Sequence, residues 1–476
     1  MEITGLSLKE LQDGLRAKKF SAKEVTLAYL ERIKKHDGDI GSFLTVTEEE
    51  AREGAERADK KISELGDGAF SEFPLLGIPI AHKDLYLTRG IRTTAASKVL
   101  ENYIPQYSST IVRCMEDAGA VLIGKLNCDA WAHGSSGENS DFFPTKNPWN
   151  KEYVPGGSSS GSAAAVSAGF VPAATGTDTG GSIRLPASFC GVVGTKPTYG
   201  RVSRYGVVAM ASSLDSMGFL TRSVEDAALL LGVVAGYDEN DATSLNQPVP
   251  DYLSSVRGPL AGNLRIGIPK EYLAQGVIPE VKEAVESAAK VFERQGAVIK
   301  EVSLPHTEYA IPVYYLVMSS EVSSNLARYD GIRFGRAREF FGDEAKRRIM
   351  LGTHALSSGY KDKYYSQATQ VRGLIAKDFT QAFEQLDLLL APVSPTPPFR
   401  LGEKTKDPLL MYLSDILSAA VNLAGLPALS LPCGFTKNNL PIGLQLIAPK
   451  LAEELLFQTG FAYQEATDWH RRSPKL

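Results

Sequence analysis

Residues that could support nucleophilic chemistry are concentrated between Pro155 and Pro186. This stretch contains two clusters rich in Gly and Ser, one around Ser158 and a second, GTDTGGS, that ends at Ser182. Glycine permits backbone angles and close approaches that other residues resist, so such a loop can direct several N–H groups at one point. Converging N–H groups suit a phosphate or the oxyanion of a tetrahedral intermediate. The stretch therefore predicts a site for a small group that carries or develops negative charge.

Three other interpretations of this stretch compete with that one. A flexible linker is disfavoured because apolar residues interrupt both clusters. A phosphate-binding P-loop is excluded because no GxxxxGK[ST] motif occurs in the chain. The segment GSSSG matches the GxSxG nucleophile elbow, with Ser159 as the nucleophile. That elbow would need an acidic residue and a downstream histidine such as His306, His354 or His470, and it stays open as the weaker alternative.

A serine nucleophile needs a base within hydrogen-bond reach, and Lys83 is the candidate. A neutral lysine is a known partner of serine nucleophiles, and Lys83 directly follows a predicted buried strand at Pro74 to Ala81. Burial there would favour the uncharged amine, while Asp84 would point to the opposite face of the strand. The neighbouring His82 is expected to be structural. A lysine that ends a strand at the surface has the same spacing, so the pattern alone does not decide between these roles.

Three motifs in order along the chain resemble the signature of the amidase signature family. They are IPIAHKD at 78–84, PGGSSSGSA at 155–163 and GTDTGGSIRLP at 176–186, and the match continues at 191–197 and 422–428. The resemblance covers nearly the whole chain. It implies a Ser–Ser–Lys triad in which Ser182 is the acyl nucleophile, Ser158 is the bridging serine and Lys83 is the base. It also implies a cis peptide between Gly157 and Ser158.

The same resemblance assigns the oxyanion and places the chain in one branch of the family. Backbone N–H groups around Thr179, Gly180 and Gly181 would hold the oxyanion. The segments 199–206, 319–331, 346–352 and 355–360 are most similar to the A-subunit branch, which belongs to tRNA-dependent amidotransferases. This branch implies a glutaminase that acts in a heterotrimer with B and C subunits. A stand-alone amidase for another small amide remains the alternative.

The branch also implies how substrates and cofactors are divided among the subunits. Ammonia from glutamine would pass to the B subunit, which amidates misacylated Glu-tRNA(Gln) or Asp-tRNA(Asn) and contacts most of the tRNA. ATP and magnesium are expected in that partner, and no cofactor or metal in this chain. By motif position, Arg348 would bind the α-carboxylate of glutamine, Asp415 its α-ammonium, and Tyr314 would line the pocket. Tyr315 is adjacent to Tyr314, so either tyrosine could face the substrate.

The composition excludes some classes of protein but does not indicate which reaction is catalysed. The 476 residues carry a net charge of −4, which gives no basic footprint for direct binding of nucleic acid. The four cysteines are dispersed and form no CxxC pair, which favours reduced thiols over a disulfide framework. The beginning of the chain lacks the apolar core of a signal peptide, and the longest apolar run, about 227–236, is too short to span a bilayer. We expect a cytoplasmic protein that does not insert into membranes.

The elements that must position these residues alternate along the chain. Residues 1 to about 65 are predicted to be helical, with capping boxes at Ser7/Glu10 and Ser21/Glu24. Strands are expected at 74–81, 120–124, 207–210, 264–268, 297–302, 386–393, 428–434 and 441–448. Helices are expected at 280–295, 311–327, 338–352, 366–385, 408–423 and 452–467. This alternation predicts an α/β fold around a twisted sheet.

The family resemblance sharpens the expected architecture. It implies a large, central, twisted and mixed β-sheet with helices on both faces. It also implies a single amidase domain over 1–476, with the helical part at about 1–65 packed on it.

Overall fold

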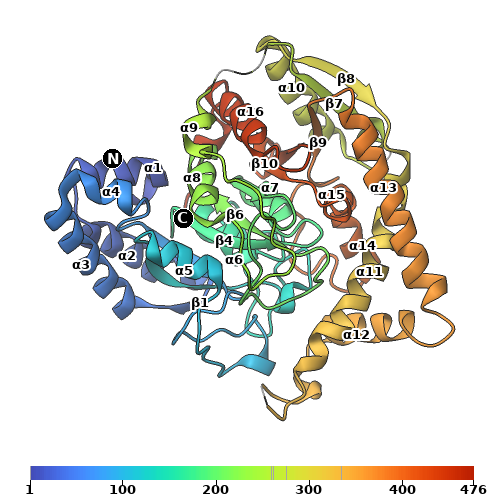
Figure 1. The fold of residues 1–476 in the computed structure, drawn as a ribbon, viewed down its shortest axis with the longest axis horizontal. Helices are drawn as coiled ribbons and strands as arrows, with labels where there is room; N and C mark the ends of the chain where they lie inside the picture. The colour runs from blue at the N-terminus through green and yellow to red at the C-terminus, as the bar shows by residue number, and fades with distance from the viewer. Residues whose placement is uncertain (1, 259, 261, 275, 334) are drawn as a thin grey trace.

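The computed structural model describes residues 2–258, 260, 262–274, 276–333 and 335–476. Its centre is a mixed sheet whose strands lie in the order β1-β3-β2-β4-β6-β5-β10-β11-β9-β7-β8 (Figure 1). The strands are β1 (Phe43–Val46), β2 (Pro79–Lys83), β3 (Val121–Leu126), β4 (Ala173–Asp178), β5 (Val193–Lys196), β6 (Ser216–Thr221), β7 (Arg265–Pro269), β8 (Val298–Val302), β9 (Leu388–Pro392), β10 (Ala428–Phe435) and β11 (Pro441–Ile447). Strand β2 runs parallel to β3 and β4, whereas β6 and β10 pair antiparallel with their neighbours. The predicted α/β fold with a mixed sheet is confirmed.

Alternating side chains along the strands separate two cores, one on each face of the sheet. In β2, Ile80 belongs to the core that also contains α8 (Val224–Val234), α10 (Pro279–Arg294) and α16 (Glu453–Glu465), while Ala81 belongs to the core around α6 (Ser160–Ser167). The same alternation recurs in β6, where Phe219 and Leu220 join opposite cores. Because neighbouring side chains of a strand point to opposite faces, helices cover the sheet on both sides. Lys83 follows Ala81 by two residues and therefore shares the face on which α6 packs.

The helices of the first face and the chain start are α1 (Leu8–Arg16), α2 (Ala22–Ile40), α3 (Glu48–Leu65), α4 (Ala69–Glu72), α5 (Thr110–Asp117), α8 (Val224–Val234), α9 (Tyr252–Val256), α10 (Pro279–Arg294) and α16 (Glu453–Glu465). Both expected capping boxes are present, at Ser7/Glu10 and at Ser21/Glu24. The chain start is not entirely helical, because β1 lies between α2 and α3 and pairs with the sheet through β3. Its Phe-Leu-Thr-Val sequence is rich in residues that favour strands. In Figure 1 the blue helices α1 to α4 of the chain start lie together at one end of the molecule.

Two short helices on the opposite face position the Gly/Ser clusters. Helix α6 (Ser160–Ser167) and helix α7 (Arg184–Cys190) are completely buried. Small side chains make this possible: a Cβ added at Gly161 would lie 2.5 Å from the carbonyl oxygen of Ser42 and 2.6 Å from that of Asn127. Each helix begins within two residues of a candidate catalytic serine. The sheet and these two helices therefore hold both clusters rigidly.

The remaining helices form the wall opposite the Gly/Ser clusters. They are α11 (Ala310–Asn325), α12 (Asp343–Ala355), α13 (Gln367–Phe383), α14 (Pro408–Tyr412) and α15 (Ala419–Ala424). The single helix expected at 408–423 is wrong, because the chain breaks between α14 and α15 through a 3₁₀ turn at Leu413–Asp415. At this break Ser418 hydrogen-bonds to Gly180, so tertiary contacts replace a continuous helix.

Two further comparisons with the expected elements concern local structure. The expected strand at 207–210 is wrong: Val207 forms only an isolated bridge with Tyr86. Short β-like segments are expected after the Gly/Ser clusters, but the pattern gave no bounds for β4, β5 and β6, whose short Gly- and Thr-containing sequences lie at the centre of the sheet. In the described residues no helix combines the length and apolar character required for crossing a membrane.

Candidate active site

Lys83 ends β2 inside the protein, and its side chain is completely buried. Its Nζ donates to Ser158 Oγ at 2.8 Å, to Ser159 Oγ at 3.0 Å and to Thr177 Oγ1 at 2.8 Å. Burial lowers the pKa of Lys83 to about 8, partly offset by the surrounding Cys128 and the acidic side chains nearby. The alternative of a surface lysine is therefore wrong. A substantial fraction of neutral amine exists near neutral pH, and the amine faces hydroxyl groups that can exchange protons with it.

Asp84 and His82 occupy the other side of β2, as the alternation of strand side chains requires. Asp84 Oδ1 lies 3.4 Å from Nζ of the buried Lys125, and Asp84 Oδ2 accepts the backbone N–H of Thr94 at 2.8 Å. His82 is also buried, and burial lowers its pKa to about 3. Neither side chain hydrogen-bonds to Lys83, so Lys83 alone of these three faces the serine clusters.

The peptide bond between Gly157 and Ser158 is cis, as the family resemblance implies. Ser158 is fully buried, and its carbonyl oxygen accepts the N–H of Asp129 at 3.1 Å. Ser159, the candidate of the elbow alternative, is also fully buried; besides the lysine it donates to the carbonyl oxygen of Thr177 at 3.3 Å. A nucleophile elbow requires an exposed hydroxyl beside a histidine, and neither is found at Ser159. The geometry therefore disfavours the elbow.

Ser182 follows β4 on the loop of the second Gly/Ser cluster and is 8% exposed, whereas Ser158 is 0% exposed. The carbonyl oxygen of Ser182 accepts the N–H of Ser159 at 3.1 Å, which joins the two clusters directly. No direct hydrogen bond between the hydroxyls of Ser158 and Ser182 is present in this structure. Ser182 is thus slightly more exposed than Ser158, and the amine contacts the cluster of Ser158.

The two glycines before Ser182 lie where there is no room for a Cβ atom. Gly181 has a φ of 148°, and a Cβ added there would lie 2.3 Å from Ser418 Oγ. A Cβ added at Gly180 would lie 2.6 Å from Tyr314 Cζ. Ser418 Oγ also donates to the carbonyl oxygen of Gly180 at 2.6 Å, which fixes the peptide plane. The loop backbone therefore approaches the side chains of Tyr314 and Ser418 more closely than a residue with a side chain could.

Three polar side chains that the sequence patterns did not single out anchor this loop. Arg184 is fully buried and pairs with Asp178, with Nε–Oδ2 at 3.0 Å and Nη2–Oδ1 at 3.1 Å. Asn422 Nδ2 donates to Asp178 Oδ1 at 3.0 Å, and its Oδ1 accepts from Arg184 Nη2 at 2.6 Å. Burial alone would raise the pKa of Asp178, but the Arg184 charge lowers it to about 2. Asp178 and Arg184 both lie within the GTDTGGSIRLP motif. An acidic and a basic residue in a motif that is expected to be buried could have indicated that they form an ion pair.

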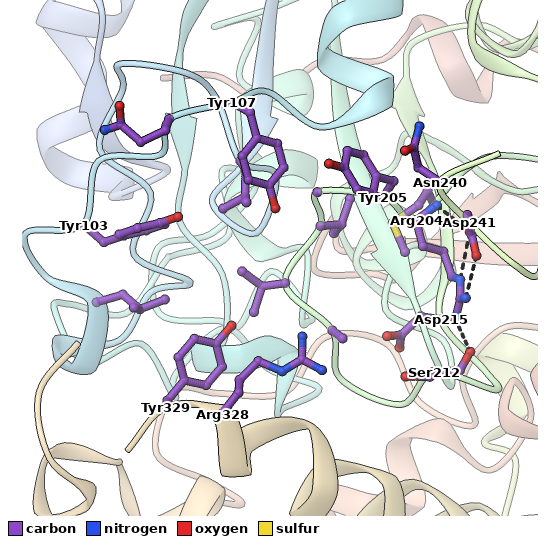
Figure 2. A pocket seen from close by; sticks show the side chains of 18 residues that line it. Tyr103, Tyr107, Arg204, Tyr205, Ser212, Asp215, Asn240, Asp241, Arg328 and Tyr329 are labelled. Carbon is purple, nitrogen blue, oxygen red and sulfur yellow. Dashed lines mark hydrogen bonds and ion pairs between the residues drawn. The ribbon is translucent and has the colours of Figure 1, made fainter. Parts of the chain in front are cut away.

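An open cavity of about 660 Å³ lies beyond Asp215, which is a partner of this loop (Figure 2). Tyr103, Tyr107, Tyr205 and Tyr329 stand around the cavity, and Asp215 lies at its wall. Thr179 Oγ1 donates to Asp215 Oδ1 at 2.8 Å, and burial raises the pKa of Asp215 to about 6. Asp215 therefore links the wall of this cavity to the loop that carries Ser182.

Arg348 on α12 is 2% exposed and lies between aromatic rings. Its guanidinium carbon is 5.6 Å from the centroid of the Tyr315 ring and 5.9 Å from that of Tyr412. Glu344 accepts from Arg348 Nε at 2.8 Å, while Nη1 contacts only the sulfur of Met318, at 3.6 Å. The terminal nitrogens are therefore available for a planar anion such as a carboxylate.

Asp415 faces the same region from the break between α14 and α15 and is 7% exposed. It accepts from Ser135 Oγ at 2.7 Å, and an added Cβ at Gly181 would lie 3.4 Å from Asp415 Oδ1. Burial raises the pKa of Asp415 to about 7, opposed by the Ser135 hydrogen bond and by the Arg348 charge. A cationic ligand would restore its ionised form. Ser135 was missed by the sequence patterns.

Both adjacent tyrosines border the site, in different ways. Tyr314 is 3% exposed and its ring covers Gly180. Tyr315 stacks on Tyr412 with ring centroids 3.9 Å apart and lies under Arg348. Tyr314 thus contacts the nucleophile loop, and Tyr315 supports the arginine. The structure brings all the predicted site residues to one region, from segments as distant as β2 and the turn before α15.

Comparison with known proteins agrees with these motifs and this geometry. Residues 24–457 match the family described as Amidase. The chain belongs to the amidase signature family. This amidase is 53% identical over 485 residues to the A subunit of the glutamyl-tRNA(Gln) amidotransferase of Geobacter metallireducens, covering 99% of each chain. It is also 53% identical to the protein of the same name from Moorella thermoacetica, covering 100% of this chain and 99% of that one.

Solved structures extend the comparison to the fold. The amidase superposes on the A subunit of the glutamyl-tRNA(Gln) amidotransferase of Thermotoga maritima with a TM-score of 0.82 and 42% identity, covering 98% of this chain and 95% of that chain. The peptide amidase of Stenotrophomonas maltophilia has a TM-score of 0.84 and 29% identity, covering 98% of both chains. The fold of this chain is therefore similar both to that of an amidotransferase A subunit and to that of a peptide amidase.

Proposed function

We propose that this chain is the glutaminase subunit of a tRNA-dependent amidotransferase, and that it hydrolyses glutamine to glutamate and ammonia. The observation that carries the proposal is the combination of two features in one site. Lys83 hydrogen-bonds to Ser158, and the backbone joins the Ser158 cluster to Ser182. The guanidinium of Arg348, whose Nη1 contacts the sulfur of Met318, lies near the carboxylate of Asp415. An amino acid substrate requires one cationic and one anionic partner in addition to a nucleophile.

In the proposed reaction Ser182 Oγ attacks the side-chain amide carbon of glutamine. Its proton passes to Ser158, whose own proton passes to the neutral amine of Lys83 over the 2.8 Å hydrogen bond. The carbonyl oxygen becomes an oxyanion, which backbone N–H groups around Thr179, Gly180 and Gly181 would hold. Removal of one such donor typically costs about 3–4 kcal/mol in the transition state.

The tetrahedral intermediate then collapses, and the C–N bond breaks as the nitrogen takes back a proton through Ser158. Ammonia leaves and an acyl-enzyme remains on Ser182. Water attacks that ester in a second cycle of the same proton route, and glutamate is released.

The partners and their cofactors form the second part of the proposal. The similarity to A subunits of amidotransferases supports assembly with further subunits. We assign amidation of Glu-tRNA(Gln) or Asp-tRNA(Asn) to a B subunit, with ATP and magnesium bound there, and a C subunit to the same complex. Among the described residues of this chain, no three His, Cys, Asp or Glu side chains gather as a metal site. The four cysteines are unpaired, which supports a cytoplasmic location for the complex.

The test is glutamate release from glutamine by this chain purified with its candidate B and C subunits. We expect release from the native complex and none above background from the Ser182→Ala complex. Retained release in the Ser182→Ala complex would refute the assigned nucleophile. Hydrolysis of another small amide, with no glutamate released by the native complex, would instead support the stand-alone amidase.

A further inference from the structure

His133 is a buried histidine near Arg348, whose charge acts both on its ring and on Asp415. It follows a left-handed turn in which Trp131 and Ala132 have φ values of 61° and 63°. Its backbone N–H donates to the carbonyl oxygen of Ala130 at 3.0 Å, and its own carbonyl oxygen accepts from Asn139 Nδ2 at 3.0 Å. Two residues later Ser135 hydrogen-bonds to Asp415. The backbone at His133 is thus fixed at the border of the proposed glutamine pocket.

The imidazole of His133 is 1% exposed, yet neither ring nitrogen has a hydrogen-bond partner among the described residues. Buried polar side-chain atoms almost always have a partner, because an unpaired one loses its hydration without compensation. Both backbone polar groups of His133 are hydrogen-bonded, so only its ring nitrogens lack a partner among the described residues. A ring held in this way is prepared for a ligand.

Charge decides which ligand group the ring can meet. Burial, and then the nearby Arg348 charge, lower the pKa of His133 well below its ordinary value. The ring is therefore neutral, with one N–H donor and one acceptor nitrogen. A neutral ring can lie close to Arg348 without repelling it, and its N–H can donate to the same anion that the guanidinium binds. Lys83 already serves the serines, so the ring is not needed as their base.

We infer that His133 is a specificity-determining residue whose ring N–H donates a hydrogen bond to the α-carboxylate of the amino acid held by Arg348. This inference rests on the proposed function, because it assumes glutamine as the substrate. It assigns the carboxylate two donors from different elements, the guanidinium on α12 and the imidazole on the loop after Asp129. An amide that lacks the carboxylate would gain nothing from His133.

The test compares two substrates in the complex with B and C subunits. 4-Aminobutanamide has the amide, chain length and ammonium group of glutamine but no α-carboxylate. We expect His133→Leu to raise the KM for glutamine roughly 10- to 100-fold with kcat changed less than about threefold, the range for a lost hydrogen bond to a charged group. The same variant should leave kcat/KM for 4-aminobutanamide unchanged. His133→Gln, which keeps an N–H donor, should recover most of the glutamine KM.

Folding is monitored by the thermal midpoint, with His354→Leu as the matched control away from the site. Because leucine removes two unpaired buried nitrogens, His133→Leu should keep or raise the midpoint. An unchanged glutamine KM in a folded His133→Leu complex would overturn the inference, as would an equal loss for both substrates. The proposed function fails in a different way, when the native complex releases no glutamate from glutamine at all.

Discussion

The rate of glutamine hydrolysis should rise about tenfold between pH 7 and pH 9 as Lys83 loses its proton. Burial lowers the pKa of this lysine from 10.5 to about 8. Relative to a lysine in water, this lowers the free energy of deprotonation by about 3 kcal/mol. Only the neutral amine can accept a proton from Ser158. With a pKa of about 8, about a tenth of the enzyme is competent at pH 7 and about nine-tenths at pH 9.

The sign follows from the direction of the pKa shift. A general base that is protonated below its pKa loses activity as the pH falls, so kcat should decline below about pH 8. With an unshifted lysine, the bend in the profile would lie near the ordinary lysine pKa of about 10.4. The rate would then still rise about tenfold per pH unit at pH 9. The shift therefore determines where the profile bends, and not only how active the enzyme is.

The assay is kcat at saturating glutamine from pH 6 to pH 9, with glutamate quantified directly in quenched samples. Saturation keeps the ammonium of glutamine on Asp415, whose pKa of about 7 should otherwise add a second limb to kcat/KM. In Asp415→Asn that second limb should vanish while the kcat limb remains. A flat kcat profile, or a rise that continues undiminished to pH 9, would refute the assignment of Lys83 as the base.

Three substitutions test the loop and the pocket. Gly180→Ala should lower kcat at least about 100-fold, because its Cβ would lie 2.6 Å from Tyr314 Cζ and must displace the loop that holds the oxyanion. Arg184→Met should reduce the free energy of unfolding by about 3–5 kcal/mol, measured by urea titration, because Asp178 would remain buried without its cation. Arg348→Met should raise the KM for glutamine at least about tenfold while sparing amides without a carboxylate.

Each of these changes has a control elsewhere in the chain. Gly373 on α13 has no atom within 4 Å of an added Cβ, so Gly373→Ala should leave kcat unchanged. Arg400 forms an exposed pair with Glu152, so Arg400→Met should hardly move the urea midpoint. If Gly180→Ala is fully active, or Arg184→Met is as stable as Arg400→Met, the close approach and the buried pair do not have the roles assigned to them. An equal loss on all amides in Arg348→Met would count against its role in carboxylate binding.

Local structure followed the sequence patterns where short-range interactions decide it. The capping boxes at Ser7 and Ser21 formed because their hydrogen bonds join residues only three positions apart. The expected helix at 408–423 is interrupted before α15, where Ser418 hydrogen-bonds to Gly180 of the nucleophile loop, a partner far away in the sequence. Strands β4 and β6 escaped prediction since their small and polar residues are stabilised by neighbours on both sides of the sheet.

The candidate site shows the same division. The Gly/Ser motifs and the position of Lys83 after a strand were visible in the sequence, and the family resemblance supplied the expected roles. Thr177 lies within the GTDTGGS cluster, but only its contact with Lys83 gives it a role. Ser135 and Asp215 carried no such pattern, because each matters only through a partner that is distant along the chain. His133 belongs to the same group: nothing in its sequence context distinguishes it from an ordinary core histidine.

The sequence by itself determined the chemical inventory: two serines, a lysine, glycines that free the backbone, and an arginine and an aspartate far downstream. Only the tertiary structure decided the protonation states of these groups and which of them lie close together. The pKa of Lys83 falls to about 8 because the sheet and α6 exclude water from its amine. Arg348 and Asp415 meet near one site because α12 packs on α11, whose Tyr314 covers Gly180, and because the turn before α15 lies against Gly181. Burial and convergence arise from packing between distant segments, which no local pattern encodes.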